Sequence, residues 1–230
     1  MADEQALGFL QDLERADETL SAAEAEIDEL AADVERVRLR ATELDELIVR
    51  LPIGRARLED ELTDAALQAA DALRAKDEAR DVQAAAEGGR SDGAKAEARR
   101  GVIRTRDALR MAVRRVAEVD DKTTELEAAG ANAIHEAAEL EARARQLAAA
   151  FRGHPRLPEQ AGSEPAAGLA GVVEWGTAAR AALLVAHGGL SSEREAVIRQ
   201  ANELGGVLLG EPLLAATPAT VRRRVESGSN

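Results

Sequence analysis

The three histidines and one run of carboxylates are the residues of this chain that could support acid–base or metal chemistry. His135, His154 and His187 are widely separated, and none has a second histidine or a carboxylate at a recognised metal-ligand spacing in a matching motif. His135 and Glu139 share a helical face, which on a charged helix is typical of a solvated contact. The acidic run at residues 59–61 would stabilise a helix start. We therefore expect no metal ligands, no cofactor and no catalytic residues.

The composition favours long helices over an enzyme core. The glycine motifs of nucleotide-binding proteins and α/β-hydrolases are missing, and there is no cysteine. Apolar residues make up 45% of the 230 residues, yet Phe9, Phe151 and Trp175 are the only aromatic ones. Alanine, leucine and valine must form the core, which suits helices packed side by side. We predict an all-α protein: an elongated antiparallel coiled coil or three-helix bundle with a small C-terminal helical module.

A heptad repeat over the first fifty residues is the strongest pattern in the chain. Its a and d positions, twelve in all, are occupied entirely by apolar residues. A 3-4 spacing sustained over six heptads predicts a helix whose seam faces a partner helix, within the chain, in a second chain, or both. The seam residues expected to drive helix packing or oligomerisation are Leu13, Leu20, Ile27, Leu30, Val34, Val37, Leu44 and Ile48.

Prolines and glycines predict where the helices end. Pro52 and Gly54 predict a break after the first helix, with a second helix over about 56–87. The glycines at 88–93 predict a loop before a third helix over about 95–152, so that the three run up, down and up. We expect a coiled-coil domain over 1–152, a linker over 153–162 that contains two prolines, and a helical module over 163–230.

The C-terminal module is predicted to hold three short helices. The first covers about 164–186 and ends at two glycines, and the second covers about 193–204, beginning at a capping box formed by Ser192 and Glu195. Thr217 as N-cap, with Pro218 following, predicts a last helix that reaches about Glu226.

The segment at 217–224 resembles the start of a recognition helix in helix-turn-helix repressors. The stretch between Pro212 and Thr217 is too short to hold the preceding helix and turn of that motif. We interpret the segment as a capped terminal helix.

Charge is unevenly distributed along the chain. The net charge is −13, and residues 1–35 hold twelve acidic residues against Arg15 alone. Residues 95–115 hold eight basic residues against two acidic ones. The candidate basic patch in this stretch consists of Arg99, Arg106, Arg110 and Arg114. It could bind phosphate on nucleic acid or lipid, but pairing with the acidic first stretch is the favoured interpretation.

The sequence favours a structural or assembly protein, a scaffold or adaptor that acts through protein–protein interaction. The alternative is a nucleic-acid-associated coiled-coil protein that uses residues 95–115 and Arg222–Arg224. Trp175 is expected to anchor helix packing, or else a partner protein. We predict a homodimer, because the apolar seam of the first helix is longer than the second helix that would cover it. The acidic N-terminus and the scarcity of lysine relative to arginine favour a cytoplasmic bacterial protein, with membrane binding disfavoured.

Overall fold

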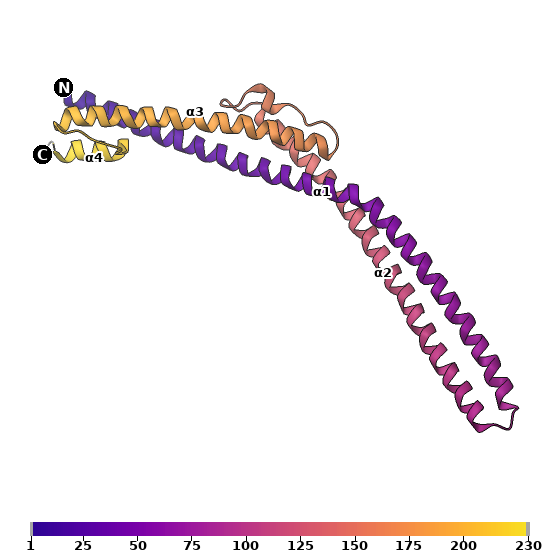
Figure 1. The fold of residues 1–230 in the computed structure, drawn as a ribbon. Coiled ribbons are helices and arrows are strands. Elements are labelled where there is room, and N and C mark those ends of the chain that lie inside the picture. The colour runs from indigo at the N-terminus through magenta and orange to yellow at the C-terminus, as the bar shows by residue number, and fades with distance from the viewer. Residues whose placement is uncertain (1, 229–230) are drawn as a thin grey trace. The chain divides into compact units, whose positions relative to one another are not determined.

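The computed structural model describes residues 2–228, and these residues form helices and connections without a strand. Helix α1 covers Ala2–Glu87, α2 covers Asp92–Phe151, α3 covers Leu169–Leu209 and α4 covers Pro218–Gly228. A short 3-10 helix, η1, covers Glu159–Gly162. Figure 1 shows these elements. The predicted all-α class and the packing of long helices side by side are confirmed.

The chain divides into two compact units. Unit 1 comprises Met1–Glu43 and Ala137–Asn230, and unit 2 comprises Leu44–Glu136. The predicted linker over 153–162 lies inside unit 1, so the C-terminal helices share a unit with the start of α1. Each unit is described separately below.

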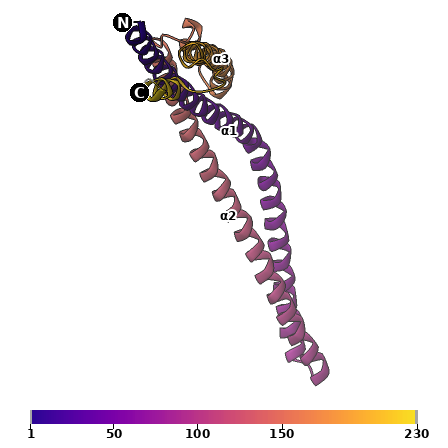
Figure 2. The ribbon, with the colours of Figure 1, turned by 90° about the vertical axis from the view of Figure 1, so that its left-hand side faces the viewer.

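Unit 2 is an antiparallel pair of helices, the second half of α1 and most of α2, joined by the turn at residues 88–91. The two helices run side by side in Figure 1 and Figure 2. Arg115 lies 3.5 Å from Glu61 and Arg99 lies 4.0 Å from Glu87, which sets the register. The predicted loop at the glycine-rich segment is confirmed.

The predicted break at Pro52 is wrong, because α1 continues through it to Glu87. A proline inside a helix removes one backbone hydrogen bond and costs about 3 kcal/mol. Here the flanking seam residues pack against α2: Gly54 lies under Leu126, and Leu51 lies over Gly130. This packing across the helix pair outweighs the local preference of proline to end a helix.

Unit 1 packs three helices around the apolar seam of α1. The α3 helix runs antiparallel to α1, as shown by ion pairs between Arg180 and Glu35 at 3.6 Å and between Arg194 and Asp17 at 2.8 Å. The last part of α2 lies on the same segment of α1, where Arg143 reaches Asp33 at 2.8 Å. The predicted up-down-up order of three helices is therefore wrong: residues 2–87 are one helix, and α2 and α3 are its partners.

The predicted break at Gly188–Gly189 is also wrong, because both glycines lie inside α3. The neighbouring leucines Leu183 and Leu190 are 1% exposed, so burial on both sides of the glycines holds the helix together. Ser192 does not cap a helix. Its hydroxyl donates to the backbone carbonyl of Gly188 at 2.9 Å, the back-bonding that serines make within helices.

The segment at 153–162 is anchored rather than free. Leu157 and Ala161 are buried, and Arg152 Nε donates to the carbonyl of Gly162 at 3.0 Å. The start of α4 is as predicted: the backbone N–H of Val221 donates to the Thr217 carbonyl at 2.9 Å, and Pro218 is the first helical residue.

The charge pairing predicted between the two stretches is replaced by other pairs. Within unit 1, Glu14 pairs with Arg222 and Glu24 pairs with Arg194. Within unit 2, Glu61 and Glu87 are the acidic partners that the basic stretch finds on α1. The ion pairs of the acidic stretch named here lie within unit 1, and those of the basic stretch lie within unit 2.

Among the described helices, α3 alone is long and apolar enough, by length and composition, to cross a membrane. Much of that apolar character serves the core of unit 1, since Val172, Leu183 and Leu190 on α3 are at most 1% exposed.

Candidate functional site

The seam residues predicted from the heptad repeat are covered within the chain. Six of the eight are buried, from Val34 at 0% to Leu20 at 7% exposure, whereas Leu30 and Ile48 are partly buried. At the beginning of the seam, Leu13 belongs to a buried cluster with Ala201 and Val221. That cluster covers Leu13 within the chain, so a second chain is not needed to bury the beginning of the seam. Phe9 remains 50% exposed.

The four arginines of the candidate basic patch differ in their partners. Arg99 pairs with Glu87, and Arg114 pairs with Glu118 at 3.1 Å. Arg106 and Arg110 make no ion pair in the part of the chain that the structure describes. These two are four residues apart on α2 and share a face.

Trp175 is a packing residue of unit 1. Its side chain is 6% exposed, and its ring centroid lies 6.1 Å from that of Phe151, which joins α3 to the end of α2. The indole Nε1 is buried without a hydrogen-bond partner. The burial favours the helix-packing interpretation over the partner-anchor interpretation.

The histidines do not gather into a site. The Nε2 atom of His154 lies 3.9 Å from Glu26, and that of His187 lies 3.4 Å from Asp28. His135 lies in unit 2. Over residues 2–228, no group of three or more histidine or carboxylate side chains is placed to hold a metal ion.

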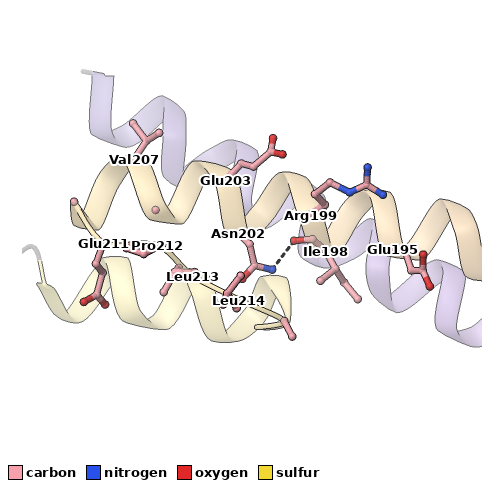
Figure 3. Close-up of a pocket in the computed structure, with 13 residues that line it drawn as sticks. Glu195, Ile198, Arg199, Asn202, Glu203, Val207, Glu211, Pro212, Leu213 and Leu214 are labelled. Carbon is pink, nitrogen blue, oxygen red and sulfur yellow. Dashed lines mark hydrogen bonds between the residues drawn. The ribbon is translucent and has the colours of Figure 1, made fainter.

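Unit 1 has a groove between the end of α3 and the connection that leads to α4. We call it the α3–α4 groove, and its volume is about 820 Å³. One wall is a single face of α3, with lining residues at 195, 198, 199, 202, 203, 206 and 207, and the other is the connection at 210–215. Its apolar lining comes from Ile198, Val207, Pro212, Leu213 and Leu214. Figure 3 shows these side chains.

Asn202 holds the connection against α3. Its Nδ2 donates to the carbonyls of Ile198 at 2.7 Å and Ala216 at 2.8 Å, and its Oδ1 accepts from the Ala216 N–H at 3.1 Å. Asn202 is 8% exposed and points toward the connection (Figure 3). Ala215 is in the left-handed region with φ of 53°, a conformation that only a well-held segment maintains in a residue other than glycine. The groove wall is therefore preformed.

Gly205 allows α4 and the connection to approach α3 closely. A methyl group added there would lie 2.7 Å from Leu213 Cδ1 and would overlap Val221. Both neighbours belong to the buried cluster beneath the groove. A glycine at this position is thus required by packing rather than by a turn, because it lies inside α3.

Four charged side chains line the groove: Glu195, Arg199 and Glu203 on α3, and Glu211 on the connection. All four are exposed, and within residues 2–228 none of them makes an ion pair. Three carboxylates against one guanidinium give the groove a net negative charge. At the same time, Val207 is 81% and Leu214 is 91% exposed at its apolar rim. The groove combines an apolar surface with acidic edges.

No family model, no curated protein and no solved structure matches this chain.

The residues of the α3–α4 groove were not singled out from the sequence. The prediction placed a helix end at 204, so the face of α3 that continues to Val207 was divided between a helix and a loop. That predicted end is wrong, because α3 continues through Gly205 and Gly206 to Leu209. Only the packing of Gly205 under Val221 shows that the first glycine is a helical contact.

Proposed function

We propose that this protein is a non-enzymatic assembly protein, a scaffold or adaptor that self-associates through the helix pair of unit 2. The observation that carries the proposal is the exposure of large apolar side chains on that pair. Eight large apolar side chains there are more than half exposed. They are Val49, Ile53, Leu67, Val82, Ile103, Met111, Val113 and Ile134.

The helix pair also has a groove beside Pro52. A groove of about 530 Å³ is lined by Leu51, Pro52, Leu126 and Ile134, among others. A two-helix pair can bury only one seam, so further apolar surface needs more helices to cover it. Two pairs that associate through this surface would form a four-helix bundle, which supports the predicted homodimer.

Sedimentation equilibrium of the full chain tests the proposal. We expect a dimer at micromolar concentration and a monomer for the double variant Ile53→Glu/Ile134→Glu, because a charge on each surface would lose its hydration on association. Both side chains are exposed, at 71% and 64%, so the fold should be retained. Val185→Glu, an equally exposed position in unit 1, is the control and should remain dimeric. A monomeric parent protein would refute the proposal.

A second candidate function is nucleic-acid association, which the lack of ion pairs at Arg106 and Arg110 favours. Arg222, in contrast, is engaged by Glu14 at 2.7 Å, so it contributes less than the sequence suggested. A gel shift with duplex DNA that weakens steeply with salt, and is lost in Arg106→Ala/Arg110→Ala, would support this function. For both functions we propose that the protein is located in the cytoplasm.

A further inference from the structure

The α3–α4 groove presents one continuous helical face along its length. The lining positions on α3 follow the spacing of a single helix face from Glu195 to Val207. At about 1.5 Å per residue this wall is about 18 Å long, which matches a partner helix of about twelve residues. On this wall Ile198 and Val207 are apolar, and the connection adds Pro212, Leu213 and Leu214. A groove with apolar side chains on both walls can bind an amphipathic helix laid into it.

The charges at the edges define what such a helix must carry. Glu195 and Glu203 are eight residues apart on α3, about 12 Å. Arg199 lies between them in sequence on the same face of α3, and Glu211 lines the groove from the connection. A complementary helix has two basic residues about two turns apart with an acidic residue between, beside its apolar stripe. A helix of the opposite charge pattern would place like charges together, which disfavours binding.

We infer that the α3–α4 groove is a docking site for a basic amphipathic helix of a partner protein. The preformed wall at Asn202 and Ala215 lowers the ordering cost of binding, because the connection is already held in place. The exposed rim residues Val207 and Leu214 supply the apolar anchors. This inference goes beyond the assembly function, since the groove lies in unit 1 and self-association was assigned to unit 2.

The test uses the full-length protein and a synthetic fluorescein-labelled helical peptide. The peptide has leucines at helical i, i+3 and i+7 spacing, and its charged edge reads Lys, Glu, Lys at intervals of four residues. The matched control peptide reads Glu, Lys, Glu. Fluorescence anisotropy should show saturable binding of the first peptide, with the control at least about tenfold weaker.

Variants at exposed positions locate the binding. Val207→Ser/Leu214→Ser should weaken binding by about tenfold or more, as loss of apolar anchors does. Leu184→Ser/Val185→Ser, at two positions of α3 that are also exposed but lie outside the groove, should bind like the parent protein. Glu195→Lys/Glu203→Lys should reverse the preference in favour of the control peptide. Circular dichroism melting checks that each variant is folded.

Several results would overturn the inference. These are absence of binding up to about 1 mM peptide, equal binding of both peptides, or no loss in Val207→Ser/Leu214→Ser. If that double variant instead lowers the sedimentation mass of the protein, the groove is occupied by a second copy, and the inference is wrong. A monomeric parent protein that binds the peptide would refute the assembly proposal and leave the docking site intact.

Discussion

The side chain of Leu51 lies directly over Gly130 on the facing helix, where an added methyl group would come within 3.2 Å of Leu51 Cδ1. The same contact recurs with the helices exchanged, because Leu126 covers Gly54 at 3.4 Å from an added methyl group. Each leucine thus lies above a glycine of the other helix. The two contacts let the helices approach closely on either side of Pro52.

Gly130→Val is expected to destabilise unit 2 by about 1–3 kcal/mol, the usual cost of overpacking a fitted contact. In a Leu51→Ala background most of this penalty should disappear, because the shortened side chain leaves room for valine. Urea denaturation followed by circular dichroism measures the four free energies of unfolding, and the coupling follows from the double-mutant cycle. An equal cost of Gly130→Val in both backgrounds would show that the two residues do not interact.

This contact also shows where sequence reasoning reached its limit. The heptad seam, the turn after Glu87 and the cap at Thr217 were predicted, because each depends on residues close together in the chain. Whether the helix breaks at Pro52 or Gly188 depends on the helices packed against it, since packing contacts on both sides of each position keep the helix continuous. Propensity alone gives no measure of that packing.

Asn202→Ala is expected to destabilise unit 1 by about 2 kcal/mol, because it leaves the partly buried Ala216 N–H and carbonyl without their partner. Hydrogen exchange should rise at residues 210–216 and remain unchanged in the middle of α3. Glu203→Ala, next to it in the chain but exposed, is the matched control. Unchanged exchange at Ala216 would contradict the role assigned to the amide.

Arg194→Ala is expected to cost about 1–2 kcal/mol, because Arg194 donates to Asp17 at 2.8 Å and Glu24 at 3.1 Å, both mostly buried. The hydrogen bond to Asp17 is the largest cause that raises the pKa of Arg194. Arg199→Ala on the same helix should change stability by less than about 0.5 kcal/mol, as surface positions usually do. Thermal denaturation in low salt would compare them. Equal melting temperatures of the two variants would argue against a stabilising role for the contacts of Arg194 with Asp17 and Glu24.

The lowered pKa of Glu35 predicts that the protein loses stability in acid. The hydrogen bond from Arg38 is the largest cause that lowers the pKa of Glu35 from its ordinary 4.5, with burial opposing and Arg180 assisting. Because the folded-state pKa is the lower one, the stabilisation is complete above the ordinary value and is lost as pH falls through the folded one. The side chain is 33% exposed, so the contribution is below about 1 kcal/mol. Glu35→Gln should flatten the pH dependence of the unfolding free energy in this acidic range. An unchanged slope would exclude Glu35 as a source.

The α3–α4 groove required the structure for a different reason. Glu195, Arg199 and Glu203 look in the sequence like any exposed helical charges. Their meaning depends on Leu214 and Glu211, which a chain reversal brings beside them. The signal available in the sequence was Asn202, a polar residue at a position where the apolar pattern of the helix calls for burial.

The regular packing of the helix pair in unit 2 determines how its length can change. Its buried and partly buried positions on α2 recur mostly at intervals of three and four residues from Ala98 through Val119 to Ala133. Insertion of seven residues into each arm near the turn would extend the pair by about 10 Å and leave every facing contact in register. Insertion into one arm alone would shift the facing residues. A version of this chain lengthened by matched heptads in both arms would therefore keep the helix contacts of unit 2.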